Sequence, residues 1–298
     1  MTADRTARRA GGNDLRLELG EGPVWDAAAE VLWWVDSEAG EVFRGGIDGD
    51  RVSVVDRRGF GEKVGSVCPA TDGGLLVAGE RSVYVVDYAG RVVASVRVLD
   101  DAVRSRLNDS ACDPRGRFLV GSVRLDGRSQ QERLVSIDAD RTLRVVAEGI
   151  TVSNGIGFSP DGSTMYYVDS RPGEVLAYDY DVDTGLASES RVVYESGGTP
   201  DGLAVDVDGN LWVAFFGEAQ VRCLTPAGQI VHVIDVPVPH PTCPEFAGPE
   251  LDMLVITTAL LKMSASERAG SPDSGAIFVA DPGVRGLPAT AWAGRTSS

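Results

Sequence analysis

One stretch of the sequence decides the fold, and it reads Ser153-Asn154-Gly155-Ile156-Gly157-Phe158-Ser159-Pro160-Asp161-Gly162. It has a polar side chain near its start, then a short apolar alternation, and then a turn built on Asp-Gly. The following residues, Ser163 to Asp169, form an apolar run that ends in an aspartate. The same phrase returns along the chain, so the sequence is built from repeats.

Four copies of the phrase carry an oxygen-bearing side chain five positions before the turn begins. The pairs of polar residue and turn residue are Glu21 and Asp26, Asn108 and Asp113, Asn154 and Ser159, and Asp201 and Asp206. Two weaker copies, at 71–78 and 248–256, complete the series. The middle residues of the six apolar runs are Trp34, Val77, Val120, Tyr167, Val213 and Val255, with spacings of 43, 43, 47, 46 and 42 residues.

A period in the forties, with β-branched and aromatic runs and Asp-Gly turns, is typical of propeller blades of about four strands each. The six copies therefore predict an all-β fold, a six-bladed β-propeller with four-stranded antiparallel blades, as a single domain over residues 15–298. Residues 1–14 are expected to form a flexible N-terminal segment. We expect the strand Leu15–Leu17 to close the ring by pairing with the C-terminal segment around Ala291-Trp292.

Composition excludes several classes of partner. The 298 residues carry a formal net charge of -16, whereas nucleic acids and anionic membranes attract clustered Lys and Arg. No apolar stretch approaches the roughly 20 residues of a membrane span, and no apolar segment follows the N-terminal arginines as in a secretory signal. The expectation is a cytoplasmic protein, a monomer or weak homodimer, with no nucleic-acid or membrane partner.

Propeller geometry brings the polar residues together, because equivalent positions of the innermost strands face one another across a central channel. Glu21, Asn108, Asn154 and Asp201 are therefore predicted to converge at one mouth of the channel, where blades two and six contribute Gly65 and Cys243. Carboxylate and amide oxygens suit one hard divalent cation in a central metal site. Ca²⁺ is the first candidate, followed by Mg²⁺, Mn²⁺, Zn²⁺ and Fe²⁺, and a hydrogen-bonded polar plug without an ion is the alternative.

Other catalytic chemistries find little support. The two histidines are His232, in an outer strand, and His240, in a proline-flanked loop. The sequence has no G-x-S-x-G motif, no phosphate-binding loop and no C-x-x-C pair among its four cysteines. Metal-assisted hydrolysis remains, in which the ion polarises a carbonyl and a carboxylate activates water. Asp201 suits the role of base because its short side chain reaches the ion with one oxygen and leaves the other free, while Glu21 serves as a ligand.

Four motifs in order carry a family resemblance: Glu21-Gly22-Pro23-Val24-Trp25, Arg106-Leu107-Asn108-Asp109, Ser153-Asn154-Gly155 and Pro200-Asp201-Gly202-Leu203. Together they resemble the senescence marker protein/gluconolactonase/luciferin-regenerating enzyme family. The resemblance implies one divalent ion and hydrolysis of sugar-acid lactones. By position, it implies Glu21, Asn154 and Asp201 as direct metal ligands and Asp201 as the general base. Asn108 and Arg106 are implied to bind substrate, with Arg106 placed to stabilise developing negative charge.

The chain departs from the family in the blade-three loop, which reads Val123-Arg124-Leu125-Asp126 where regucalcin-like members carry an acidic pair that contacts sugar hydroxyls. Asp126 takes that place with a shorter reach, and Arg124 changes the charge of the pocket. Both are predicted to bind substrate. A non-sugar ester or lactone, a cyclising reaction of specialised metabolism, a phosphotriesterase-like activity and a non-enzymatic calcium-binding scaffold stay open. Two polar loops, 124–133 and 262–274, are candidates to lean over the channel.

Overall fold

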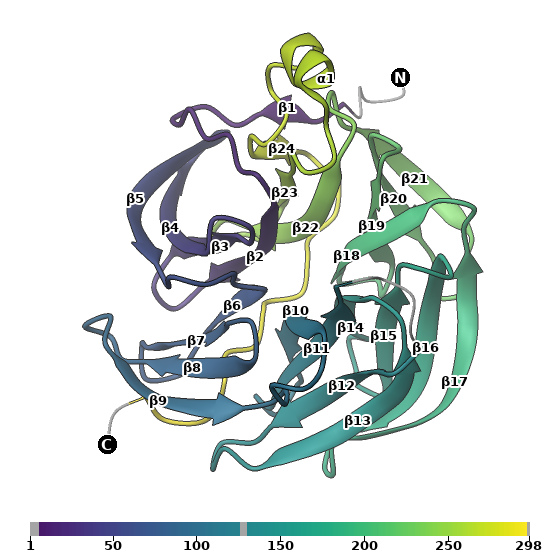
Figure 1. Cartoon of the computed structure of the whole chain (residues 1–298). Coiled ribbons are helices and arrows are strands. Elements are labelled where there is room, and N and C mark those ends of the chain that lie inside the picture. The colour runs from purple at the N-terminus through teal and green to yellow at the C-terminus, as the bar shows by residue number, and fades with distance from the viewer. Residues whose placement is uncertain (1–5, 126–129, 297–298) are drawn as a thin grey trace.

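The computed structural model describes residues 6–125 and 130–296, which form six four-stranded antiparallel sheets arranged in a ring (Figure 1). The predicted six-bladed propeller is confirmed. Blade one has β2 (Gly20–Asp26), β3 (Val31–Asp36), β4 (Glu41–Asp48) and β5 (Arg51–Gly59). Blade two has β6 (Ser66–Pro69), β7 (Leu75–Ala78), β8 (Ser82–Val86) and β9 (Val92–Arg97). Blade three has β10 (Ser105–Cys112), β11 (Phe118–Arg124), β12 (Glu132–Ile137) and β13 (Leu143–Ile150).

The second half of the ring follows the same plan. Blade four has β14 (Ser153–Phe158), β15 (Thr164–Asp169), β16 (Glu174–Asp181) and β17 (Leu186–Glu195). Blade five has β18 (Thr199–Val205), β19 (Leu211–Phe216), β20 (Gln220–Leu224) and β21 (Ile230–Asp235). Blade six has β22 (Pro241–Ala247), β23 (Met253–Thr258), β24 (Phe278–Ala280) and, as its outermost strand, β1 (Arg8–Arg9).

The core lies between the blades. Six clusters of buried apolar side chains each join two neighbouring blades, so every interface of the ring is filled. The six residues that mark the repeat all lie in second strands, and all are 0% exposed: Trp34, Val77, Val120, Tyr167, Val213 and Val255. These strands are covered on both faces by adjacent blades, which explains why their sequence runs are apolar throughout.

The ring closes through the N-terminal segment. Arg8 pairs with Val279 and Arg9 with Phe278, so the first strand of the chain completes the last blade. The neighbouring side chains of Ala7 and Ala10 are 1% and 2% exposed. The prediction that Leu15–Leu17 closes the ring is therefore wrong, and the expected flexible segment 1–14 is wrong from Thr6 onward. Two arginines carry no strand pattern, because an outermost strand buries little of its side chains.

The C-terminal strap, defined here as residues 286–293, crosses the ring from blade six to blades two and three (yellow in Figure 1). The backbone N–H of Leu287 donates to Val205 O at 3.1 Å, and that of Trp292 donates to Pro69 O at 2.8 Å. Trp292 is fully buried against blades two and three. Its strand partner is thus blade two and not the expected Leu15–Leu17 segment.

The loop between β23 and β24 contains α1 (Ala265–Gly270). A capping box starts this helix, since Ser264 Oγ accepts from the Glu267 N–H and the Glu267 carboxylate accepts from the Ser264 N–H. In the described part of the chain, no helical segment has the length and apolar character needed to cross a membrane.

Candidate metal centre and active site

Irregular strand pairing turns the polar residues of the repeat toward the channel. The register between the first and second strands shifts between Glu21 and Val24 in blade one and between Asn154 and Ile156 in blade four. Blades three, five and six have equivalent shifts at 107/110, 200/203 and 241/244. A β-bulge of this kind bends the strand and re-aims a side chain. Blade two, which contributes Gly65 and no donor, pairs without a shift.

Two aspartates fix the backbone just before two of the candidate ligands. The Asp36 carboxylate accepts from the N–H groups of Glu18 and Leu19 at 2.9 and 3.1 Å. In blade four, Asp169 accepts from the N–H groups of Thr151 and Val152, both at 2.9 Å. Each aspartate is the last residue of its second strand, and each holds the chain that leads into Glu21 or Asn154. The site is therefore positioned by blade structure and not by loose loops.

Glycines let the neighbouring inner strands approach closely. A Cβ added at Gly155 would lie 2.7 Å from Asp201 O, and one added at Gly202 would lie 2.5 Å from the Cys243 Cβ. Any larger residue would push the blades apart at the channel mouth. In the Asn-Gly and Asp-Gly pairs, the first residue therefore places a side-chain oxygen in the channel, and the glycine leaves room for the next blade.

A chain of hydrogen bonds links blades three and four. Arg106 Nη1 donates to Asn108 Oδ1 at 2.7 Å, and Asn108 Nδ2 donates to Asn154 Oδ1 at 2.7 Å. Asn154 Nδ2 in turn donates to Ser170 Oγ at 2.7 Å. Because an amide oxygen has two lone pairs, Asn154 Oδ1 keeps one for a further partner. The predicted residues Arg106, Asn108 and Asn154 are thus brought together and oriented by one another.

The carboxylates of the site are strongly perturbed. Burial and the charges of Asp201 and Asp109 raise the pKa of Glu21 well above its usual value, and Arg106 opposes this shift. Burial and Asp109 likewise raise the pKa of Asp201, against the charges of Lys262 and Arg106. The pKa of Arg106 is lowered by burial and raised in part by nearby acidic groups that include Glu21 and Asp201. These five groups therefore lie within electrostatic reach of one another.

The donor set fits a divalent cation. Asn154 and Asp201 are 7% and 6% exposed, and within the described ranges neither Glu21 nor Asp201 forms a salt bridge. Crowded carboxylates without a cationic partner are costly, and a bound cation relieves both burial and repulsion. No cluster of three or more His, Cys, Asp and Glu side chains arranged for a metal occurs in residues 6–125 and 130–296. The candidate centre differs in kind, since its third candidate ligand is the amide oxygen of Asn154.

Asp109 is a site residue that the repeat pattern did not single out. It is 9% exposed, and burial raises its pKa to about 6. It follows Asn108 inside the register shift of β10 between Leu107 and Ser110, and it lines the channel cavity described below. Its place in the Arg106–Asp109 motif was the available signal. Of the two predicted residues of the blade-three loop, Arg124 ends β11 and pairs with Ser105, and Asp126 lies outside the described residues.

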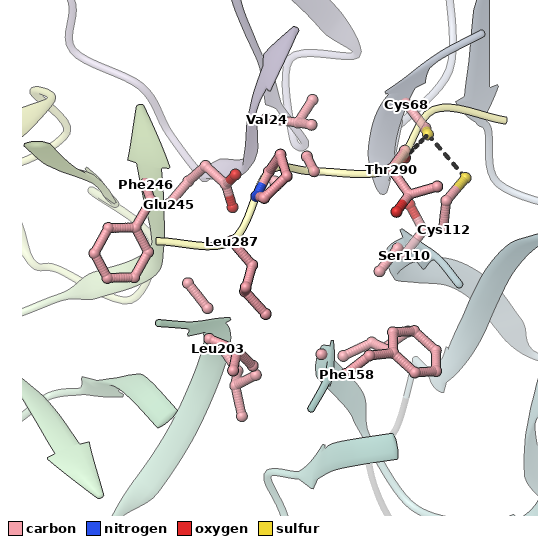
Figure 2. Close-up of a pocket in the computed structure, with 18 of the residues that line it drawn as sticks. Val24, Cys68, Ser110, Cys112, Phe158, Leu203, Glu245, Phe246, Leu287 and Thr290 are labelled. Carbon is pink, nitrogen blue, oxygen red and sulfur yellow. Dashed lines mark hydrogen bonds between the residues drawn. The ribbon is translucent and has the colours of Figure 1, made fainter. Parts of the chain in front are cut away.

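The opposite end of the channel holds a cavity of about 310 Å³ that the C-terminal strap crosses. Figure 2 shows Leu203, Leu287 and Phe158 around it, with Glu245 on one side and the Cys68 and Cys112 pair on the other. The two Sγ atoms are 3.2 Å apart, and all four cysteines are buried and form no disulfide. Most of the lining of this cavity is apolar, although two acidic residues, Asp109 and Glu245, also line it.

Comparison with known proteins agrees with this geometry. Residues 19–260 match the family model described as the SMP-30/Gluconolactonase/LRE-like region. The chain belongs to this family. It is 35% identical to a 6-deoxy-6-sulfogluconolactonase of Pseudomonas putida, covering 93% of this chain and 95% of that protein. It is 31% identical to regucalcin of Danio rerio, over 93% and 95% of the two chains.

One solved structure has the same fold as this protein over nearly the whole length of both chains. It is a calcium-binding regucalcin of Agrobacterium tumefaciens, with a TM-score of 0.88, 24% identity and coverage of 97% of this chain and 98% of that one. The resemblance inferred from the four motifs is therefore confirmed, both in family and in fold.

Proposed function

We propose that this protein is a divalent-metal-dependent lactonase that opens a sugar-acid lactone by adding water to its carbonyl carbon. The observation that carries the proposal is the convergence of Glu21, Asn154 and Asp201 beside Arg106 at one mouth of the channel. A purely structural ion would not need a buried guanidinium beside it. The lactonase name of the Pseudomonas putida relative supports the same reaction class.

Glu21, Asn154 and Asp201 would hold the ion through three oxygens from blades one, four and five. Ca²⁺ is the first candidate, with Mg²⁺, Mn²⁺, Zn²⁺ and Fe²⁺ as alternatives, because carboxylate and amide oxygens are hard donors. When bound, the ion would supply Lewis-acid polarisation of the lactone carbonyl.

Asp201 would remove a proton from the attacking water, and its second oxygen is the atom suited to accept it. The water oxygen bonds to the carbonyl carbon, the ring C–O bond breaks, and the proton passes to the departing ring oxygen as a hydroxyl. No described residue donates a hydrogen bond to the Asp201 carboxylate, so the base is not already satisfied by the protein. General-base assistance of this kind accelerates reactions by about 10²–10⁴-fold.

Arg106 would stabilise negative charge that develops on the carbonyl oxygen. One nitrogen, Nη1, is engaged with Asn108 Oδ1 and with Leu107 O at 2.8 Å, which fixes the guanidinium plane. The remaining N–H groups are available for substrate. Asn108 would contact substrate as well as orient Arg106. Arg124 would change the charge of the substrate pocket, and Asp126, which lies outside the described residues, stays a predicted substrate contact.

The test is to strip the protein with chelator and restore Ca²⁺, Mg²⁺, Mn²⁺, Zn²⁺ or Fe²⁺ singly, while pH-stat titration follows a panel of aldonolactones. We expect turnover to return with at least one ion and to be lost in Asp201→Asn at the same ion occupancy. Asp206→Asn is the matched control, because Asp206 lies near the other end of the same strand. Tight ion binding without turnover of any lactone would contradict the proposal.

A further inference from the structure

The ammonium group of Lys262 lies over an aromatic pair at the rim of the channel, between blades five and six. Phe216 and His240 stack with ring centroids 4.2 Å apart and an interplanar angle of 9°. Lys262 Nζ lies over the Phe216 ring, 5.2 Å from its centroid. Phe216 pairs with Thr199, two residues before Asp201. The ammonium group therefore belongs to the same mouth as the candidate metal centre.

Blade five differs from its neighbours at this position. The last residue of the second strand is Asp36 in blade one and Asp169 in blade four, where each carboxylate ties down the backbone. In blade five the same position is Phe216. An aromatic ring there provides no backbone tie, but its face attracts a cation. Blade five therefore lacks the hydrogen bonds from carboxylate to backbone at this position and has a cation–π contact with Lys262 instead.

The turn that carries Lys262 is fixed on both sides. The N–H of Leu261 donates to Glu18 O at 2.8 Å, and the N–H of Met263 donates to Leu260 O at 3.1 Å. Met263 is buried, and Lys262 takes the left-handed backbone conformation with φ 67°. Non-glycine residues adopt that conformation at a cost, so the surrounding structure must impose it. The exposed Lys262 side chain is therefore attached to a turn whose backbone is held in place.

Lys262 also lacks a carboxylate of its own. Across the described ranges no salt bridge involves it, whereas the other lysine, Lys63, lies 2.6 Å from Glu38. Blade six faces blade three across a six-bladed ring, so Lys262 lies across the mouth from Arg106.

We propose that Lys262 binds an anionic substituent of the substrate, such as a phosphate, sulfonate or carboxylate, at the end remote from the reacting carbonyl. A lactone whose carbonyl meets Arg106 and the metal ligands would direct its far end across the mouth, toward the Phe216 and Lys262 stack. This assignment rests on the proposed lactonase function and names its substrate class, since a neutral lactone would leave the ammonium group without an anionic partner.

The experiment compares kcat/KM for 6-phosphoglucono-δ-lactone and glucono-δ-lactone, using the metal-loaded protein. We expect the wild type to favour the phosphorylated lactone by about three- to fivefold at low salt, as an exposed ion pair allows. Lys262→Met removes the charge and keeps the apolar stem, so kcat/KM should fall more for the phosphorylated lactone than for the neutral one, and the preference disappears. Lys262→Arg retains the preference, and added salt weakens it in the wild type.

Arg285→Met is the control for net charge. Arg285 is exposed at the opposite end of the channel, paired with Glu250 at 2.8 Å, and its loss removes one positive charge far from the mouth. We expect this variant to keep the wild-type preference. An equal loss with both lactones in Lys262→Met would assign the lysine a structural role and overturn the proposal, as would a wild type that does not discriminate.

A second measurement separates this proposal from the lactonase function. Calorimetric binding of 6-phosphogluconate and gluconate to the metal-loaded protein needs no turnover. Tighter binding of the phosphorylated acid by the wild type, lost in Lys262→Met, supports the anion site even if no lactone is hydrolysed. Equal binding of the two acids by the wild type contradicts the anion site even if lactones are hydrolysed.

Discussion

The two ends of the central channel are built by the same six inner strands, yet they have opposite characters. At one mouth, bulges turn Glu21, Asn154 and Asp201 inward, and the Asp201 carboxylate accepts no hydrogen bond from a described residue. At the other, apolar side chains and the C-terminal strap line a cavity of about 310 Å³. The comparison shows that strand irregularity concentrates polar groups for chemistry, while regular pairing and a crossing segment provide stability.

Two aspartates of blade five, at opposite ends of one strand, differ in the same way as the two ends of the channel. Asp201 and Asp206 are 6% and 1% exposed, and they lie near opposite ends of β18. Asp206 accepts from Trp212 Nε1 at 3.0 Å and from the Asn210 N–H at 2.8 Å. Asp201 has burial and a neighbouring carboxylate instead, which raise its pKa. A satisfied buried carboxylate stabilises the fold, whereas an unsatisfied one is available for a cation and a proton.

The largest effect that would separate the two ends is expected from Asp201→Asn. Loss of the proposed base and of one metal-ligand charge should lower kcat/KM for a lactone by about 10²–10⁴-fold. The free energy of unfolding of the chelator-treated protein should stay the same or rise, because a buried carboxylate is removed. Steady-state kinetics and denaturant unfolding on one preparation check both. A stable variant with nearly full activity would show that Asp201 is not part of the chemistry.

Trp292→Ala should act in the opposite way, on stability and not on chemistry. Trp292 is fully buried against blades two and three, and truncation of such a side chain costs about 3–5 kcal/mol. Trp292→Phe should cost much less, since Trp292 Nε1 has no partner among the described groups. Denaturant unfolding measures both variants. A loss below about 1 kcal/mol for the alanine variant would mean that the strap does not hold the blades together.

Glu245→Gln tests how a buried carboxyl group beside the C-terminal strap makes stability depend on pH. Burial raises the pKa of Glu245 to about 8 from its usual value near 4.5. The folded protein therefore retains a proton that the unfolded chain loses, so this group's stabilising contribution is complete below pH 4.5 and is lost as pH rises through 8. The wild type should lose stability relative to Glu245→Gln between pH 6 and pH 9, by on the order of 3 kcal/mol.

Denaturant unfolding of the wild type and of Glu245→Gln at pH 6 and at pH 9 measures this relative loss of stability. Glu250→Gln is the matched control, because Glu250 is exposed in the same blade and pairs with Arg285 at the surface. Its pH dependence should follow the wild type. If the curves of the wild type and Glu245→Gln were parallel, Glu245 would be ionised in the folded protein at neutral pH.

The smallest effect is expected from Asp206→Asn, the counterpart of Asp201→Asn. The amide keeps one acceptor oxygen and turns a donor toward the N–H groups that the carboxylate now accepts, so the unfolding free energy should fall by about 1–3 kcal/mol. Activity measured well below the melting midpoint should be retained. A loss of turnover at full stability would show that the two ends of β18 are coupled and would weaken the contrast between them.

Much of this molecule follows from the sequence alone. The period in the forties and the apolar runs around Trp34, Val77 and their four equivalents predicted six blades. The structure buries all six residues, because a strand covered on both faces must be apolar along its length. The repeat phase also predicted that Glu21, Asn108, Asn154 and Asp201 meet, since equivalent positions in a closed ring face one channel. The family motifs added Arg106, which the structure places beside them.

Tertiary structure alone decided the ring closure, the strap and the rim. Arg8–Arg9 pairs with residues about 270 positions later, and Trp292 pairs with Ala70, so neither contact leaves a local pattern. Lys262 and Phe216 belong to different blades and meet because a rigid turn imposes the lysine's position. Periodicity reports which face of a strand is buried, whereas contacts between distant segments depend on the shape of the finished ring and the loops that cross it.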